Sequence, residues 1–213
     1  MTTEKILEKV QHQQPRLIYL SGKTCTGKTT FANYLVQHGY KKIELDKIVT
    51  ESVVIPFGVL PGDGFRTAYR DLGPVEQTNA FIGAAKMEIS KKLEEASLVV
   101  EGAIASPRIL GELFSGEFKS FLFIYLHPVH ADIYEQRILS RFEAGAKSDS
   151  AGLPKDFWEL IQVSDLQEFK NTDKVSSGIL TSIKVYAAKS MEESKKRLEG
   201  FQAAFTDIAI VEI

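Results

Sequence analysis

The sequence predicts an α/β protein of three layers, in which helices cover both faces of a five-stranded parallel sheet. Two features predict this fold. Short apolar runs typical of buried strands alternate with segments of helical periodicity, and the runs are residues 16–20, 40–46, 98–102, 121–126 and 208–211. A phosphate-binding motif directly follows the first run. Strands that alternate with helices imply βαβ crossovers, and therefore a parallel sheet that is buried on both faces.

Length and composition limit the chain to one domain. Its 213 residues are 44% apolar and 25% charged, which suffices for one α/β core over residues 1–213 with a mobile lid. The net charge of −2 provides no general attraction for nucleic acid or an anionic membrane. The sequence also lacks a basic stripe with interleaved aromatic residues. We therefore expect a small-molecule partner, and no nucleic acid or membrane.

The cellular compartment is predicted from cysteine content and from the first residues. Cys25 is the only cysteine, so a disulfide within the chain is impossible. No apolar run approaches the roughly 18 residues of a membrane span. The start at Met1–Lys5 has no secretory apolar region. These features predict a cytoplasmic protein.

The motif after the first strand is a complete G-x-x-x-x-G-K-[ST] pattern, known as Walker A. Its glycines allow backbone N–H groups to point inward at phosphate oxygens. Lys28 can reach the β- and γ-phosphates, and the Thr29 hydroxyl can bind the Mg²⁺ that bridges them. The predicted nucleotide-binding residues are Gly22, Lys23, Thr24, Cys25, Thr26, Gly27, Lys28, Thr29 and Thr30.

The surroundings of the motif match its chemistry. A strand precedes it, and a helical pattern follows that Gly39 ends. The helix adds the positive end of its dipole beneath a bound anion. We interpret the loop as a nucleotide-phosphate site.

Carboxylates end two of the predicted strands. In the strand 40–46, alternation places Glu44 and Asp46 on the same side. Glu101 ends the third strand, the position of a Walker B carboxylate that holds Mg²⁺ or its water. The carboxyl ends of parallel strands share one edge, where ligands of open α/β sheets bind. We predict Thr29, Glu44 and Glu101 as metal ligands and Asp46 as the base that accepts a hydroxyl proton.

Two further segments carry candidate arginines. The proline- and glycine-rich segment 50–75 contains Arg66 and Arg70 four residues apart, which can clamp an anionic acceptor or simply be surface charges. A helix is predicted over about 129–143, with Arg137 and Arg141 on one face. The small polar residues of 144–154 are typical of a hinged segment. Helical patterns follow over about 155–169 and 178–199.

These motifs together resemble the P-loop kinases of small molecules, a superfamily that includes nucleoside, nucleotide and shikimate kinases. The resemblance rests on four features: Gly22–Thr29, Glu44-Leu45-Asp46, Glu101-Gly102, and the pair Arg137 and Arg141. It implies the P-loop NTPase fold with strand order 2-3-1-4-5. It also implies ATP and Mg²⁺ as cofactors and a lid over residues 137–155 that brings catalytic arginines to the γ-phosphate. The segment 50–75 then binds the acceptor.

The resemblance leaves the acceptor open. Glu44-x-Asp46 followed by Gly64-Phe65-Arg66 is similar to shikimate kinases, whereas Glu101-Gly102 is more similar to nucleoside kinases. We expect transfer of the γ-phosphate to a small metabolite, with a hydroxyl acceptor preferred because of Asp46. Substrate binding then involves Asp46, Arg66, Arg70 and Glu101. The alternatives are a nucleoside monophosphate kinase, and a regulatory module that hydrolyses a nucleoside triphosphate. The sequence does not predict the oligomeric state.

Overall fold

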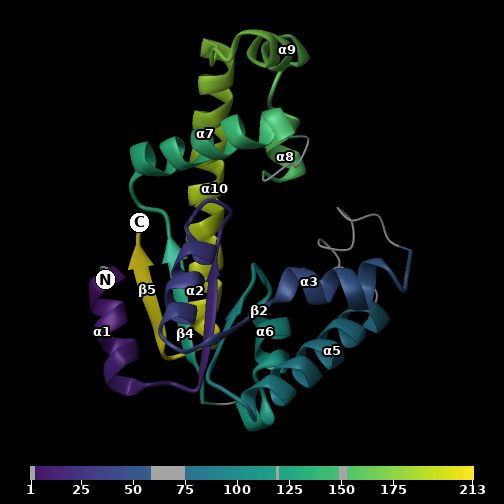
Figure 1. The fold of residues 1–213 in the computed structure, drawn as a ribbon, viewed down its shortest axis with the longest axis vertical. Coiled ribbons are helices and arrows are strands. Elements are labelled where there is room, and N and C mark those ends of the chain that lie inside the picture. The colour runs from purple at the N-terminus through teal and green to yellow at the C-terminus, as the bar shows by residue number, and fades with distance from the viewer. Residues whose placement is uncertain (1–2, 59–74, 119, 149–152) are drawn as a thin grey trace.

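The computed structural model describes residues 3–58, 75–118, 120–148 and 153–213 (Figure 1). Its strands are β1 (Leu17–Gly22), β2 (Lys41–Glu44), β3 (Leu98–Glu101), β4 (Leu122–His127) and β5 (Ile208–Glu212). All four strand pairs are parallel, and the order in the sheet is β2-β3-β1-β4-β5. The predicted three-layer fold and strand order are therefore confirmed.

The helices cover both faces of the sheet and extend beyond its carboxyl edge (Figure 1). Those of the first half of the chain are α1 (Thr3–Gln13), α2 (Lys28–Gln37), α3 (Leu45–Val49), the π-helix η1 (Thr50–Val54) and α5 (Val75–Leu93). Those of the second half are α6 (Pro107–Leu113), the 3₁₀ helix η2 (Gly116–Phe118), α7 (Ala131–Ser148), α8 (Lys155–Trp158), α9 (Val163–Thr172) and α10 (Ser177–Ala204).

Alternating residues of the central strand divide the core into two layers. In β1, Leu17 and Tyr19 pack with side chains of α5, α6 and the end of α10, whereas Ile18 and Leu20 pack with α1 and α2. All four side chains are buried. The unbroken apolar run at residues 17–20 is thus explained by helices on both sides of the sheet.

The second strand is shorter than its sequence pattern predicts. It ends at Glu44, and Leu45 and Asp46 form the first turn of α3. The alternation argument for Glu44 and Asp46 is therefore wrong, because the two residues belong to different elements. Leu45 turns inward and is fully buried. Gly102 lies against it, since a Cβ there would come within 2.9 Å of Leu45 carbons.

Helices α7, α8, α9 and residues 177–193 of α10 form a unit that we call the helical arm. It has its own buried cluster, which includes Phe142, Phe157, Phe169 and Tyr186. In Figure 1 the arm lies beyond the carboxyl ends of the strands, and α10 continues from it down along the sheet. The predicted helix 155–169 is wrong as a single element, because α8 and α9 are separate.

Serine side chains cap the N-termini of two helices. Ser106 caps α6, accepting a hydrogen bond from the Ile109 N–H at 3.3 Å, with Pro107 in the first turn. Ser176 caps α10 in the same way through the Ile179 N–H at 3.2 Å. The segment expected to be hinged is in part helical, because α7 continues through Gly145 to Ser148. Across the described residues, no helix is both long and apolar enough to cross a membrane.

Candidate active site

The phosphate-binding loop connects β1 to α2 at the carboxyl edge of the sheet, as the motif predicts. Two of its glycines are required by geometry. Gly22 has φ +151°, and a Cβ there would lie 2.7 Å from both the Leu126 carbonyl oxygen and Thr26 Oγ1. Gly27 has φ +85° at the start of α2, a left-handed conformation that favours glycine. The loop therefore wraps closely over the end of β4.

Lys28 extends back across this loop. Its Nζ donates hydrogen bonds to the carbonyl oxygens of Gly22 at 2.9 Å and of Lys23 at 2.8 Å. Burial lowers the pKa of Lys28 from 10.5 to about 8, although the charges of Asp46 and Glu101 oppose that shift. A bound polyphosphate would favour the charged form. The Lys28 ammonium thus lies where the motif predicts it. The nearby carboxylates do not fully offset the effect of burial on its pKa, and an additional negative charge, such as a phosphate, would favour the ammonium further.

Thr29 and Glu101 meet beside this lysine. The Thr29 hydroxyl donates to Glu101 Oε1 at 3.4 Å, joining the first turn of α2 to the end of β3. The other carboxylate oxygen, Oε2, is buried and has no hydrogen-bond partner. Burial raises the pKa of Glu101, with Glu44 and Asp46 adding to the effect. A hydroxyl and a carboxylate with an unpaired buried oxygen suit Mg²⁺, a hard cation that takes oxygen ligands and keeps several waters.

The predicted metal ligand Glu44 lies apart from this pair. It is the register partner of Glu101 on the neighbouring strand, but its carboxylate pairs with Lys42 Nζ at 2.5 Å and is about half exposed. Lys42 also lies 3.9 Å from Glu101. Among the described residues, no cluster of three or more His, Cys, Asp or Glu side chains could hold a metal. Thr29 and Glu101 are therefore the better candidates.

Asp46 lies on the first turn of α3. It is exposed, and its negative charge is the strongest of those acting on Lys28. It also acts on Glu101 and on the buried Tyr19. Asp46 is therefore provided by α3 and not, as predicted, by β2, and its role as a base stays a prediction.

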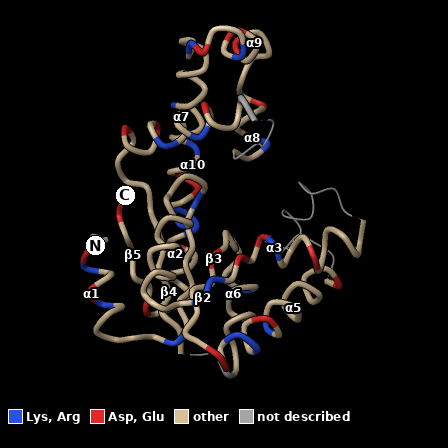
Figure 2. Tube along the Cα trace, viewed as in Figure 1, with Lys and Arg blue, Asp and Glu red and all other residues tan. Residues whose placement is uncertain are grey.

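The arm brings two arginines to the other side of the loop. A Cβ on Gly27 would lie 3.6 Å from Arg137 Nη1, so the guanidinium lies directly over the start of α2. Arg141, Lys28 and Arg137 are the charges that act on the Cys25 thiol, whose pKa burial nevertheless raises. Figure 2 shows basic positions on α7 and α10 where these helices meet above the sheet. The structure thus places both predicted arginines at the phosphate loop.

The remaining predicted residues, Arg66 and Arg70, lie outside the described residues. Trp158 is a packing residue of the arm: its ring contacts Phe142 and Phe157, and its Nε1 donates to the Leu153 carbonyl at 3.1 Å.

Three residues at the site have no motif that could identify them. Arg197 on α10 donates to the Ala103 carbonyl, just after β3, at 3.4 Å, and its charge acts on Lys28 and Tyr19. Glu193, one turn earlier, pairs with Lys23 Nζ at 2.6 Å. Tyr134 on α7 donates to the Thr24 carbonyl at 2.8 Å. All three residues lie about 110 to 175 positions from the loop in sequence. The only signal in the sequence is the four-residue spacing of Glu193 and Arg197, which places these two on one face of α10.

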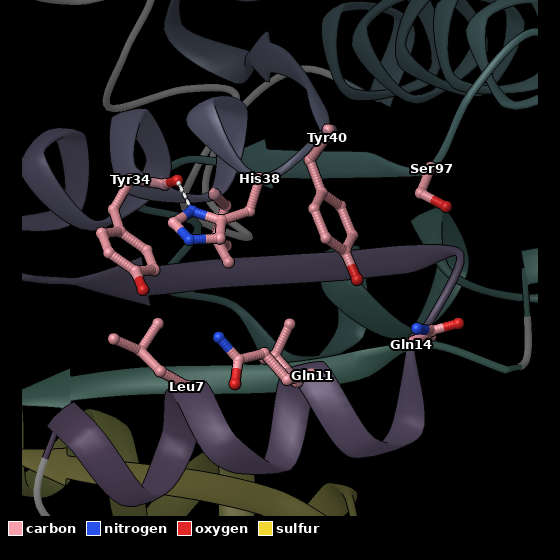
Figure 3. Close-up of a pocket in the computed structure, with 10 residues that line it drawn as sticks. Leu7, Gln11, Gln14, Tyr34, His38, Tyr40 and Ser97 are labelled. Atoms are coloured by element: carbon pink, nitrogen blue, oxygen red, sulfur yellow. Dashed lines mark hydrogen bonds between the residues drawn. The ribbon is translucent and has the colours of Figure 1, made fainter.

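A separate cavity of about 290 Å³ lies between α1 and α2 (Figure 3). Its lining includes Gln11, Tyr34, His38 and Tyr40, and no lining residue is charged. Helix α2 begins at the phosphate loop with Lys28 and first borders the cavity at Tyr34, so roughly 9 Å of helix separates the two. With no cation in its lining, this cavity is not the phosphate site.

No protein-family model and no curated protein sequence matches the chain. Similar solved structures include a sugar kinase from Janibacter sp. HTCC2649, at 12% identity and a TM-score of 0.47 over 93% of this chain and 84% of that one. They also include the shikimate kinase of Acinetobacter baumannii in complex with shikimate, at 15% identity and a TM-score of 0.44 over 91% and 82%. The shikimate kinase of Bacteroides thetaiotaomicron has 16% identity and a TM-score of 0.40 over 88% and 94%. Because these scores are below 0.5, the fold assignment rests on the phosphate loop and sheet topology.

Proposed function

We propose that the protein is an ATP- and Mg²⁺-dependent kinase that transfers the γ-phosphate to a hydroxyl group of a small metabolite. One observation carries the proposal. A carboxylate on α3, Asp46, and an arginine on the helical arm, Arg137, approach the same phosphate loop from different elements. A module that only binds a nucleotide needs the loop alone. A carboxylate and an arginine beside it provide the base and the charge stabilisation of phosphoryl transfer.

The roles of the residues follow from their positions. Backbone N–H groups of the loop and Lys28 hold the phosphates, while Thr29 and Glu101 hold the magnesium ion and its water. Mg²⁺ neutralises charge on the phosphate oxygens when it is bound. Arg137 and Arg141 offset the charge that develops on the transferred group, and the arm excludes water that would hydrolyse ATP.

Asp46 accounts for the preference for an alcohol. The acceptor oxygen forms a bond to the γ-phosphorus, and Asp46 accepts its proton. The bond from that phosphorus to the β–γ bridging oxygen breaks, and ADP leaves with the bridging oxygen. Asp46 is exposed, as a base that must receive a substrate needs to be.

A nucleoside monophosphate is the second candidate acceptor, and Arg197 favours it. This guanidinium adds a cation beside Ala103, on the same side of the sheet as Asp46. An acceptor that is already a phosphate needs no base, so Asp46 would then bind metal-bound water or a sugar.

A thermal-shift screen followed by a transfer assay tests the proposal. The protein with a non-hydrolysable ATP analogue and Mg²⁺ is screened against nucleosides, nucleoside monophosphates and hydroxylated acids, and stabilising compounds are assayed with ATP for a phosphorylated product. A stabilising alcohol that becomes phosphorylated is the expected result. Stabilisation by monophosphates alone contradicts the hydroxyl acceptor. ATP hydrolysis that no acceptor redirects into a product contradicts the kinase. Lys28→Ala should abolish transfer and leave the fold intact.

A further inference from the structure

The first half of the phosphate loop is attached to the helical arm. The ammonium of Lys23 pairs with Glu193 on α10 at 2.6 Å, and only 14% of the Lys23 side chain is exposed. The next carbonyl, that of Thr24, accepts a hydrogen bond from the buried Tyr134 hydroxyl on α7 at 2.8 Å. Cys25 packs against the apolar cluster of the arm. Three successive loop residues thus contact the arm in three chemically different ways.

The loop needs external support at this point. Cys25 has φ +65°, a left-handed conformation that is unfavourable for a residue with a Cβ. The loop's own contacts here are limited to hydrogen bonds of Thr26 and Lys28 to the Lys23 carbonyl. A strained backbone persists when its surroundings hold it in place, and the arm supplies the surroundings for residues 23–25.

Glu193 is itself held in position by its neighbour. Ser194 is fully buried, and its hydroxyl lies 3.1 Å from Tyr125 Oη and 3.0 Å from His127 Nδ1, both on β4. Tyr125 Oη also donates to the Ser194 carbonyl at 3.2 Å. These bonds fix the turn of α10 that carries Glu193 against the end of β4, beside the loop. The carboxylate is therefore presented to Lys23 from a rigid element.

The ion pair is also less exposed than an ordinary surface pair, since only 14% of the Lys23 side chain and 43% of the Glu193 side chain are exposed. Burial would raise the pKa of Glu193, yet the hydrogen bond and charge of Lys23, together with the charges of Lys189 and Arg197, hold that pKa below its usual value. Glu192, the preceding residue, differs in two respects: its partner, Lys196 at 2.7 Å, lies on the same helix, and both side chains are about two-thirds exposed.

We infer that Glu193 is a positioning residue that sets the conformation of the phosphate loop through Lys23, with Tyr134 holding the adjacent peptide. The inference rests on the proposed function in so far as the loop binds ATP. Its consequence is that Glu193 contributes to nucleotide affinity without touching the nucleotide. Loss of the pair lets residues 22–27 sample conformations that do not bind phosphate. The apparent dissociation constant for ATP then rises in inverse proportion to the fraction of molecules whose loop is in the binding conformation.

The experiment compares Glu193→Gln with Glu192→Gln in the full chain. Hydrogen–deuterium exchange of loop amides is measured without nucleotide, and ATP affinity is measured by titration calorimetry. We expect Glu193→Gln to speed exchange at residues 22–27 and to raise Kd for ATP by about threefold to tenfold, the range for a partly buried charged hydrogen bond. Glu192→Gln should leave both measurements unchanged. In kinetic assays, KM for ATP should rise in Glu193→Gln while kcat changes little.

Two further variants test the route of the effect. Tyr134→Phe removes one hydroxyl and should speed exchange at residues 24–26. In a Lys23→Met background, Glu193→Gln should have no additional effect, because the residue acts through Lys23. Unchanged loop exchange in Glu193→Gln, or the same loss of affinity in the Lys23→Met background, overturns the inference. If the wild type binds no ATP, the kinase proposal fails, while loop exchange still decides whether Glu193 positions the loop.

Discussion

The Thr29 hydroxyl lies 3.4 Å from the carboxylate of Glu101, and this contact joins the phosphate loop to the end of the neighbouring strand β3. The free oxygen of that carboxylate is buried without a partner. Magnesium bound here would be held between two elements that ATP alone does not connect, so metal and nucleotide binding should be coupled.

Replacing Glu101 with glutamine should separate metal dependence from nucleotide binding. We expect kcat to fall by about a hundredfold and the Mg²⁺ concentration for half-maximal activity to rise, while ATP binding without metal is retained. Glu44→Gln is the matched control, because Glu44 lies on the neighbouring strand β2 and is paired there with Lys42. A Mg²⁺ titration of transfer rate checks both variants, and an equal effect of the two would assign the metal to Glu44 as well.

The low pKa of Lys28 predicts a pH dependence of ATP affinity. Burial lowers that pKa to about 8, and bound phosphates favour the ammonium. Below about pH 8 the free protein already carries the proton and affinity is constant. Above it the proton must be taken up on binding, so affinity should fall by about tenfold per pH unit.

Calorimetric titrations with ATP at about pH 7.5 to about pH 9.5, in buffers of different ionisation enthalpy, measure both the affinity and the proton uptake. Lys28→Met should bind weakly and show neither effect. Affinity in the wild type that stays constant to about pH 9.5 would show that Lys28 is protonated throughout this range.

The strands and the phosphate loop could be predicted from local sequence because local pattern determines them. A buried parallel strand contains a continuous apolar run, such as residues 98–100 of β3, and the loop has a fixed sequence motif. The predicted end of β2 is wrong because the apolar alternation continues through Leu45, although this buried residue belongs to the first turn of α3. Periodicity over so few residues does not distinguish the last residues of a strand from the first turn of a helix.

The contacts between the loop and α10 could not be predicted because they depend on tertiary packing. Arg197 and Glu193 lie in a long helix rich in charged residues, where most such side chains are exposed. Serine is a polar residue that is usually exposed, so the sequence does not indicate that Ser190 and Ser194 are buried. The face of α10 that reaches the site therefore becomes evident only once Tyr125, His127 and Ser194 are brought together.

Arg137 should contribute more to catalysis than Arg141, because it lies directly over Gly27. We expect Arg137→Ala to lower kcat by about a hundredfold to a thousandfold, the range for one charge-stabilising donor at a transition state. Arg137→Lys should recover only part of this, since lysine lacks the forked guanidinium. Arg108→Ala, on a residue paired with Glu112 on α6, is the control. Steady-state kinetics with saturating ATP distinguish the variants, and an unchanged kcat in Arg137→Ala would place this guanidinium outside the reaction.

Asp46→Asn tests the base. The substitution keeps the size of the side chain and removes its proton acceptor, so kcat should fall far more than ATP affinity does. Glu51→Gln, an exposed carboxylate near α3 that pairs with Lys47 at 3.8 Å, should have no effect. Single-turnover transfer and ATP binding are measured in parallel. An equal loss in both would assign Asp46 to the metal or its water.

Arg197 connects the acceptor side of the site to α10, and its replacement tests the charge of the acceptor. The guanidinium donates to the Ala103 carbonyl and acts on Lys28 and Tyr19, so it adds positive charge beside Asp46. If the acceptor carries a carboxylate or phosphate, Arg197→Met should raise KM for the acceptor by about tenfold to a hundredfold and leave KM for ATP unchanged. Lys195→Met, on an exposed residue of the same helix, is the control. A neutral acceptor predicts the same KM in both variants, and a rise in KM for ATP alone would move Arg197 to the nucleotide side of the site.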